Sequence, residues 1–473
     1  MPRAAASTVG HPAVDRPARA DRSPLSLEAQ RRAGTQGFNH RPPNVRHAIS
    51  LYTGAGGLDL GFEAAGVETR VAVEMDRDAV ATLRMNRPSW ALIPESIQSV
   101  AAASTAILQA AGLREGDADL LIGGPPCQPF SKSGYWARGD AKRLADPRAE
   151  TLVAYLRVLR DTKPRAFLLE NVPGLTFSAK DEGLVFLARE IDRLNREHRT
   201  RYSFHVALLR AVEFGVPQDR QRVFIIGSRE GTDFTFPGPT HMAPRVQSST
   251  GGIGTLESFE AEARALGLQP FRTAWDAIGD LEDDDDPELA MTGKWAALLP
   301  SIPEGRNYLF HTARGIAEGG KPLFGWRRRY WNFLLKLSKQ LPSWTIAAQP
   351  GPATGPFHWK NRRLSARELM RLQTFPEGYR IAGNLRAAQR QVGNAVPSAL
   401  AEKLALEIRR QLLGEPHLQS EILTLLPPRR RPTPPPERVR PVSATYRALA
   451  GDHEAHPGTG QGYSAQRRGR SSS

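Results

Sequence analysis

Short apolar runs that alternate with helix-like segments restrict the fold of this chain more than any other feature. The helical patterns at 58–65 and 78–84 each follow an apolar run. The apolar runs are at 47–52, 69–73, 120–122, 166–169 and 223–227. Such alternation is typical of a doubly wound, mostly parallel β-sheet, because helices supply the crossovers that parallel strands need. The sequence therefore predicts an α/β fold.

The regular pattern stops near residue 230 and resumes at 363, so a second, smaller and irregular domain is expected between the two parts. That segment has clusters of Gly and Pro and an acidic run at 281–289. Both ends of the chain are rich in Pro and Arg and poor in apolar residues, which predicts disorder. The predicted divisions are 1–44 (disordered basic arm), 45–230, 231–362, 363–415 and 416–473 (disordered basic tail).

The charge of the chain favours a polyanionic partner. The formal net charge is +15, and only ten of the 64 basic residues are lysine. Arginine pairs bidentately with phosphates and base edges, which favours a nucleic acid. The alternative is a GC-rich genome that enriches Arg, Ala and Pro together. The single cysteine excludes an internal disulfide, no metal site is expected, and the absence of a long apolar window predicts a cytoplasmic protein with no membrane contact.

A glycine-rich turn follows the first apolar run. In SLYTGAGGLDLGF (50–62), Gly54, Gly56 and Gly57 allow the backbone to approach a ligand closely at the edge of the sheet. Glu74 closes the next apolar run, where its carboxylate can accept both hydroxyls of a ribose. The turn lacks the third glycine of a pyrophosphate cradle, so a nucleoside such as S-adenosylmethionine fits better than NAD. An ordinary tight turn beside a surface Glu is the alternative.

The only cysteine, Cys127, stands in GGPPCQPFS (123–131), directly after a predicted strand. Free cysteines are most often small buried hydrophobic residues. Here the neighbours are glycine, two prolines and glutamine at the predicted edge, which favours an exposed nucleophile. An unperturbed thiol has a pKa near 8.5, so its environment or its substrate has to help form the thiolate.

Two further segments place charged side chains at the same predicted edge. Glu170 ends the run FLLENV (167–172), where partial burial would raise its pKa and let it hold a proton near neutrality. In VPQDRQRVFIIG (216–227), Gln218, Arg220 and Arg222 alternate and would share one face, able to bind a phosphate and a base carbonyl. A structural carboxylate and a solvated basic strand end are the competing interpretations.

Taken together, six ordered motifs resemble those of the DNA (cytosine-5) methyltransferases, over residues 46–413. The motifs are GAGG (54–57), PPCQPFS (125–131), ENV (170–172), QDRQR (218–222), RELMRLQTFP (367–376) and QVGNAVP (391–397). The resemblance implies a Rossmann-like methyltransferase fold that uses S-adenosyl-L-methionine. It makes 45–230 and 363–415 the catalytic and cofactor-binding domain and 231–362 the target-recognition domain.

The resemblance also implies roles in the reaction. Cys127 would attack C6 of a cytosine that is flipped out of the duplex. Glu170 would contact N3 and the exocyclic amine and supply a proton, Arg222 would hold O2, and Arg220 would hold a phosphate or the loop that carries the nucleophile. A water or hydroxide would remove the C5 proton.

For the cofactor, the resemblance implies contacts from several parts of the chain. Tyr52 would stack near the adenosine, Glu74 would bind the ribose, and Met75 would cover the adenine. Ser96 stands where the family commonly has Asp, so the partner of the adenine amine stays open, with Glu95 as a substitute. The full implied set is Tyr52, Gly54, Ala55, Gly56, Gly57, Leu58, Glu74, Met75, Ile97, Pro126, Asn394 and Val396.

The implied contacts to double-stranded DNA come from Gln128, Ser131, Arg220 and Thr345. Arginines at 327–329, flanked by Trp326, Tyr330 and Trp331, would read guanine or grip phosphates, and core aromatics in a basic strand are an equal alternative. We expect a monomeric modification enzyme of a restriction-modification system, with a cognate endonuclease encoded nearby. The alternatives are a tRNA-methylating relative, a catalytically silent DNA-binding relative, and a nicotinamide dehydrogenase.

Overall fold

The computed structural model describes residues 45–101, 104–126, 150–173, 182–244, 256–281, 286–323, 331–419 and 422–447. The N-terminal segment 1–44 and the last residues, 448–473, lie outside this set, as do Cys127, Gln128, Ser131 and the arginines at 327–329. The predicted disorder of the two chain ends is therefore untested for 1–44 and 448–473.

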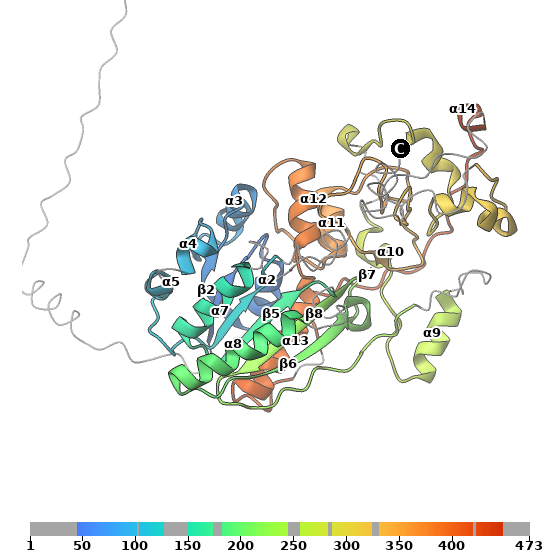
Figure 1. Cartoon of the computed structure of the whole chain (residues 1–473). Coiled ribbons are helices and arrows are strands. Elements are labelled where there is room, and N and C mark those ends of the chain that lie inside the picture. Colours follow the sequence, from blue (N-terminus) through green and yellow to red (C-terminus); the bar gives the residue numbers. More distant parts are fainter. Residues whose placement is uncertain are drawn as a thin grey trace, which may run out of the picture. The chain divides into compact units, whose positions relative to one another are not determined.

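A seven-stranded sheet has the order β3-β2-β1-β4-β5-β8-β6 (Figure 1). The first five strands in this order run parallel, and β8 pairs antiparallel with both β5 and β6. The predicted doubly wound, mostly parallel sheet is thus present. Its strands are β1 (Arg46–Leu51), β2 (Val67–Val73), β3 (Ala91–Ile93), β4 (Leu120–Gly123), β5 (Ala166–Asn171), β6 (Ser203–Arg210) and β8 (Gln221–Ser228).

Helices cover both faces of the sheet because alternate residues of each strand point to opposite sides. On one face, Ala48, Ile122 and Leu168 pack with α2 (Gly57–Ala64) and α13 (Ser398–Leu412). On the other face, Ile49, Leu121 and Leu169 pack with four further helices. These are α4 (Ile97–Ala101), α5 (Ser104–Ala111), α7 (Glu150–Thr162) and α8 (Glu182–His198).

The remaining elements are α3 (Arg77–Asn86), which connects the parallel strands β2 and β3, and elements that lie toward the end of the sheet where the parallel strands finish (Figure 1). A two-residue parallel pairing joins Gln218 to Ser343 and Asp219 to Trp344. These elements are α3 (Arg77–Asn86), β7 (Gln218–Asp219), α9 (Leu256–Ala265), α10 (Ala274–Ile278), β9 (Ser343–Trp344), α11 (Ala366–Leu372), α12 (Leu385–Asn394) and α14 (Ala444–Arg447), with 3₁₀ turns at Ala211–Phe214, Pro287–Leu289, Ala296–Ser301, Tyr308–His311 and Ala313–Glu318.

The irregular segment between 231 and 362 shares a core with the sheet part. One buried cluster combines Ala55 and Leu60 with Ile278 of α10, Trp359 and Leu372 of α11. Two other clusters, around Phe333 and around Phe271, consist mainly of residues from 242 to 357. The division at 231–362 therefore remains a prediction, and the segment is tied to the sheet part by common packing.

The prediction of disorder beyond residue 416 is wrong for 422–447. This stretch follows a defined path and bonds to the rest of the chain through Thr424, Arg429, Glu437 and Tyr446. Composition misleads here because arginines in this stretch donate to carbonyl and carboxylate groups of the folded part.

No helix among the described residues combines the length and apolar character that a bilayer span requires.

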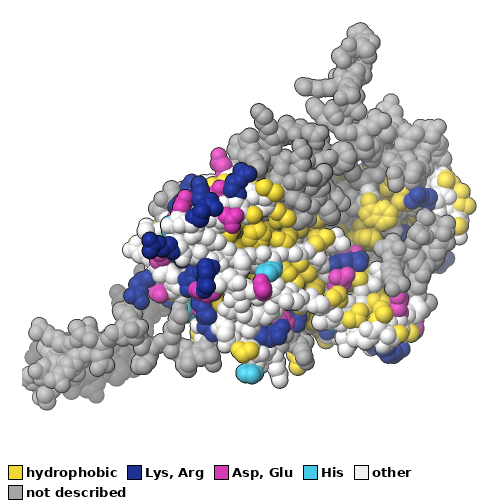
Figure 2. All heavy atoms as spheres, turned by 60° about the horizontal axis from the view of Figure 1, so that its bottom comes forward, with side chains coloured by type: hydrophobic (Ala, Val, Ile, Leu, Met, Phe, Trp, Pro, Cys, Tyr) yellow, Lys and Arg dark blue, Asp and Glu magenta, His cyan; other side chains and the backbone are white. Residues whose placement is uncertain are grey.

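Many arginines are structural as well. Arg220 and Arg409 donate to backbone carbonyls, and Arg362 binds Glu368 through both of its terminal nitrogens. On the face shown in Figure 2, basic side chains lie next to acidic ones rather than in one uniform patch. The excess of arginine therefore supports a polyanionic partner less directly than its number alone suggests.

Asp59, in the first turn of α2, is a fully buried carboxyl group. Its Oδ1 accepts a bond from Thr69 at 3.2 Å, while Oδ2 has no hydrogen-bond partner among the described residues. Burial raises its pKa to about 7, against weaker lowering by hydrogen bonds from Ser50 and Thr69. The folded protein therefore binds this proton more tightly than the unfolded chain does.

We expect Asp59→Asn to remove a pH dependence of stability. Because the folded pKa is raised, the carboxyl destabilises the protein progressively as the pH rises from about 4 to about 7. The variant and the wild type should unfold alike near pH 4, and at pH 8 the variant should be more stable by up to roughly 4 kcal/mol. Denaturant unfolding at both pH values measures this, and parallel pH profiles would contradict it.

Candidate functional site

The candidate site lies at the edge of the sheet where β1, β2, β4 and β5 end. These strands are parallel, so their carboxyl ends meet at one edge. The edge presents the glycine turn after β1, Glu74 after β2, Gly124 to Pro126 after β4, and Glu170 near the end of β5. The structure thus brings together the segments that the sequence predicts to share one site.

The turn after β1 has a backbone that favours glycine. Gly54 has φ 57° and Gly56 has φ 80°, both in the left-handed region. A Cβ atom built on Gly54 would meet nothing nearer than the Tyr52 carbonyl oxygen at 4.0 Å, so space is open above the turn. Tyr52 itself has φ 55°, and its hydroxyl donates to the Thr151 carbonyl at 2.7 Å.

Glu74 closes the turn from β2. One carboxylate oxygen accepts the Gly54 N–H and the other accepts the Asp76 N–H, each at 2.7 Å. Burial raises the pKa of Glu74, opposed by these backbone bonds. Each oxygen keeps acceptor capacity beside the open turn, which suits the two hydroxyls of a ribose. The predicted nucleoside-binding residues therefore fit an adenosyl group.

The C-terminal part of the chain closes the other side of this turn. A Cβ on Gly57 would lie 2.6 Å from the Val396 carbonyl oxygen, so glycine permits the close approach. Tyr379 also reaches the turn, because its hydroxyl donates to the Ala55 carbonyl at 2.8 Å. Tyr379 was not predicted from the sequence, because it is distant from the turn along the chain and lies outside the six motifs.

The other predicted cofactor residues differ in exposure. Met75 is 66% exposed beside Glu74, a position from which it can cover a planar ring. Pro126 and Asn394 are exposed as well. Ala55, Leu58 and Ile97 are buried in hydrophobic clusters.

Ser96, at the position where the family commonly has Asp, has a structural role at the start of α4. Ser96 is half-buried, and its Oγ accepts the Gln98 N–H at 3.2 Å at the start of α4.

Glu170 and Arg222 form an ion pair at the end of β5. The Arg222 Nε lies 2.8 Å from Glu170 Oε1, and both side chains are largely buried. Burial raises the pKa of Glu170, while Arg222 and then Arg220 act against this rise. A carboxyl group with a raised pKa can hold and donate a proton near neutrality.

Gly124 makes room for this carboxyl group. A Cβ at Gly124 would lie 2.7 Å from Glu170 Oε2, so any larger residue would displace Glu170. The role of Gly124 is visible only in the structure, because the two residues are 46 positions apart in the sequence.

Arg220 is buried among backbone carbonyls. It is 1% exposed and donates to the carbonyls of Ile346, at 3.3 Å, and Gly393, at 2.7 Å. Gln218 is fully buried and accepts the Ile346 N–H. In the structure the Arg220 side chain connects the residue after β7 to two distant backbone segments, and its predicted contact with a phosphate or with the loop that carries the nucleophile remains a prediction.

The chain that leads to Cys127 is held on two sides. The Asn171 side chain donates to the Pro125 carbonyl at 3.2 Å, and the Thr151 hydroxyl donates to the Pro126 carbonyl at 3.2 Å. Asn171 and Thr151 thus fix the two prolines beside Glu170. Cys127 itself, with Gln128 and Ser131, lies outside the described residues.

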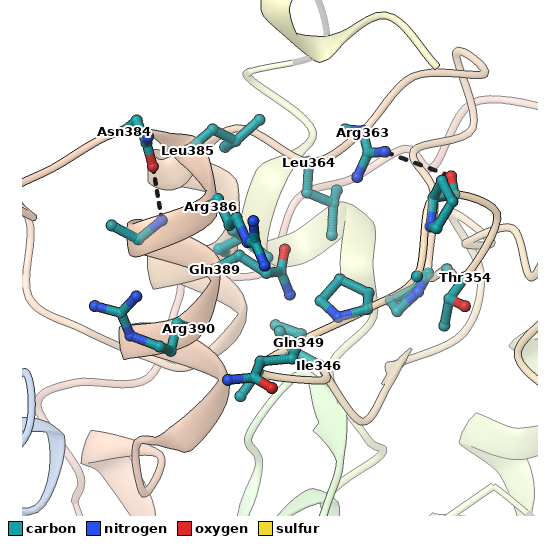
Figure 3. A pocket seen from close by; sticks show the side chains of 18 of the residues that line it. Ile346, Gln349, Thr354, Arg363, Leu364, Asn384, Leu385, Arg386, Gln389 and Arg390 are labelled. Carbon is teal, nitrogen blue, oxygen red and sulfur yellow. Dashed lines mark hydrogen bonds between the residues drawn. The ribbon is translucent and has the colours of Figure 1, made fainter. Parts of the chain in front are cut away.

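Thr345 is exposed at the end of β9, and its hydroxyl donates to the Asp219 carbonyl at 2.6 Å. A cleft of about 1100 Å³ begins at the next residue, Ile346. Figure 3 shows α12 along one side of it, with Arg386, Gln389 and Arg390, and the segment with Gln349 and Thr354 along the other. The cleft is distinct from the glycine turn and from Glu170.

The charges of the cleft are partly compensated. Arg390 pairs with Asp76 and Asp78 at 2.9 and 2.8 Å. Arg386 is exposed and forms no ion pair with a carboxylate among the described residues. Among the described residues, no group of three or more His, Cys, Asp or Glu side chains is placed to hold a metal ion.

Comparison with known proteins adds to this geometry. The family model of C-5 cytosine-specific DNA methylases matches residues 47–410. The type II methyltransferase M.SacI of Streptomyces achromogenes is 38% identical over 398 residues, which cover 79% of this chain and 94% of that protein. M1.HphI of Haemophilus parahaemolyticus, also a type II methyltransferase, is 30% identical over 78% of this chain and 87% of its own length.

Proposed function

Because the chain belongs to the C-5 cytosine-specific DNA methylases, we propose that it methylates C5 of a cytosine in a specific double-stranded DNA sequence, with S-adenosyl-L-methionine as donor and through a covalent bond from Cys127. The observation that carries the proposal is the common sheet edge. A cradle for an adenosyl group and a buried carboxyl–guanidinium pair lie at that edge, on the neighbouring strands β1, β2, β4 and β5.

The bound donor supplies an electrophilic methyl group on a sulfonium. Glu74 and the open glycine turn would hold its ribose, and Met75 would cover its adenine. Gly57 and Val396 approach each other closely and would close the methionine end. The C5 of cytosine is unreachable inside the base stack, so the target base has to leave the duplex and enter the edge between the turn and Glu170.

Cytosine C5 is a poor nucleophile, and the side chains at the edge can correct this. Addition of the Cys127 thiolate to C6 makes C5 electron-rich, while Glu170 delivers its proton toward N3 and so limits the negative charge on the ring. Arg222 would hold O2 and keep the base in register. After C5 is alkylated, a water or hydroxide takes the C5 proton, Cys127 leaves C6 as the thiolate, and N3 returns its proton to Glu170, so that the ring is aromatic again.

The proton role of Glu170 is consistent with its surroundings. Its carboxyl is buried and its pKa is raised, with Arg222 directly against Oε1. Burial favours the protonated form of such a group more than exposure to water would. Arg220, in contrast, would act through the backbone, because it fixes Ile346 and Gly393 beside the site.

The cleft between α12 and 346–357 is where we place the sugar–phosphate backbone beside the target base. It begins one residue after Thr345, which is exposed and anchored to Asp219. Arg386 faces this cleft (Figure 3). The segment 231–362 would supply sequence recognition, and the protein would act as a monomeric modification enzyme beside a separately encoded endonuclease.

We expect Arg386→Ala to weaken DNA binding without changing its sequence preference. Loss of one phosphate contact should raise the KM for duplex severalfold and reduce the slope of log affinity against log salt by about 1. Arg380→Ala is the matched control, since Arg380 is exposed nearby and does not line the cleft. Equal effects of the two variants on the slope of log affinity against log salt would contradict the placement of the DNA backbone in the cleft.

Two measurements test the proposed function. Bisulfite sequencing of DNA from cells that express the protein should show methylated cytosines in one short sequence. Transfer of labelled methyl groups to DNA, and not to tRNA, separates this function from that of a tRNA-methylating relative. Methylation of tRNA alone, or cofactor binding without any transfer, would overturn the proposal.

A further inference from the structure

Residues 422–447 form an extended segment, here called the C-terminal strap, that passes over several separate parts of the molecule. It contains one short helix, α14, and little other regular structure. Its bonds reach α13, α10, Glu304 and Lys339, and the aromatic cluster around Trp295. None of the motifs of the proposed reaction lies in it.

The strap begins on the sheet side. Glu402 of α13 is 1% exposed, and its Oε1 accepts bonds from both the backbone N–H and the hydroxyl of Thr424, at 2.8 and 2.7 Å. Its Oε2 accepts the Leu425 N–H at 3.1 Å. Leu425 and Leu426 pack on the core that contains α13. A buried carboxylate of the sheet part thus receives three bonds from the strap.

The second anchor is Asp276 of α10, which is fully buried. Its two oxygens accept the Arg430 N–H at 2.8 Å and the Arg429 guanidinium at 3.1 Å. Arg429 donates in addition to the carbonyls of Pro270 and Phe271. Truncating Arg429 would leave two carbonyls and part of a buried carboxylate without this donor.

The third anchor is a buried lysine. Lys339 is 2% exposed, and its ammonium donates to the Pro435 carbonyl at 3.1 Å and to Glu437 at 2.7 Å. Glu304 lies 3.3 Å from the same ammonium and accepts the Glu437 N–H. Lys339 lowers the pKa of Glu437, with help from Lys360.

The strap ends in an aromatic cluster. Tyr446 is 4% exposed, stacks on Trp295 with ring centroids 6.0 Å apart, and donates its hydroxyl to the Lys294 carbonyl. This cluster also contains Phe333. The strap therefore connects α13 with three sites inside the segment 231–362.

We infer that the C-terminal strap is a positioning element that holds the segment 231–362 on the sheet part in the arrangement that binds DNA. This inference rests on the proposed function, in which the two parts act on one duplex. The backbone already joins the two parts after β8 and before α11, and the strap adds a third connection through buried charges. Arg429 and Glu437 are its positioning residues.

The expected effect of losing an anchor depends on the fraction of molecules that hold the DNA-binding arrangement. If the binding arrangement is held in only a fraction of molecules, the apparent dissociation constant rises by the inverse of that fraction. Glu170, Arg222 and the glycine turn do not contact the strap in any described bond. Loss of an anchor should therefore raise the KM for DNA and leave kcat at saturating DNA nearly unchanged.

The test compares Arg429→Ala with Arg438→Ala. Both changes remove one arginine from the strap, but Arg438 is exposed and none of the three anchors uses it. We expect the first variant to raise the KM for duplex about tenfold with kcat within twofold, and faster amide exchange at α10. The second should match the wild type, and Arg429→Lys should recover part of the lost affinity.

Two outcomes would overturn the inference. One is faster exchange at α10 with an unchanged KM, which would make the strap purely structural. The other is an equal change in Arg429→Ala and Arg438→Ala, which would indicate only a loss of charge. Fluorescence anisotropy of a labelled duplex gives the ratio of the two variants' DNA affinities without any turnover. If the wild-type protein transferred no methyl group, the proposed function would be contradicted, but the role of the strap in DNA binding could still be measured in this way.

Discussion

Replacement of Cys127 by serine is expected to abolish methyl transfer, with a loss in kcat of at least about 10³-fold. A serine hydroxyl is far less acidic than a thiol and does not add to C6, so C5 stays unactivated. Transfer of labelled methyl groups to duplex DNA measures the loss. Binding of S-adenosylmethionine and of duplex should persist, because Glu74, Gly54 and the cleft are untouched.

The local geometry makes this variant informative. Pro125 and Pro126 are held by Asn171 and Thr151 through their carbonyl oxygens. The donors are the side chains of Asn171 and Thr151, and neither bond involves the side chain at 127, so the serine variant should keep the fold and the attachment of Pro125 and Pro126. Methylation at the wild-type rate by Cys127→Ser would remove the nucleophile assignment.

Replacement of Glu170 by glutamine is expected to lower kcat by about 10²- to 10⁴-fold. Glutamine keeps the shape of the side chain but has no proton to deliver toward N3. Glu213→Gln is the matched control, since burial raises the pKa of Glu213 too, yet it lies on the 3₁₀ turn Ala211–Phe214 and faces Arg210. Equal losses in the two variants would contradict the proton role of Glu170.

The pH dependence of kcat belongs to the same prediction. The reaction needs protonated Glu170, so kcat should fall as the pH rises through the pKa of Glu170 in the complex. Arg222 lowers that pKa. The residual kcat of Arg222→Ala should therefore start to fall at a higher pH than the kcat of the wild type. A fall in kcat that starts at a lower pH in Arg222→Ala than in the wild type would contradict the proton role of Glu170.

The sheet was predictable because several of its strands are short apolar runs that alternate with helix-like segments. The predicted run 166–169 is contained in β5, and the predicted helix at 58–65 differs from α2 (Gly57–Ala64) by one residue at each end. Strand β6 was missed, since half-exposed residues such as Val206 and Leu208 blur its pattern. The antiparallel direction of β8 is set by its partners β5 and β6, which the sequence does not reveal.

The site was predictable where a motif coincides with a strand end, as at Glu74 and Glu170. It was not predictable where a side chain is defined by distant backbone. Arg220 and Arg222 are two residues apart and of one type, yet Ile346 and Gly393 make the first structural. The order of 422–447 has the same origin, because Glu402, Asp276 and Lys339 supply partners that composition cannot show.

The central claim is a covalent bond between the Cys127 sulfur and cytosine C6. Duplex DNA with 5-fluorocytosine at the target position tests it directly, because fluorine cannot leave C5 as a proton does and the adduct persists. In the presence of S-adenosylmethionine, we expect a stable protein–DNA complex that mass spectrometry of peptides locates at Cys127. Absence of the adduct, with the unmodified target sequence methylated normally, would contradict the claim.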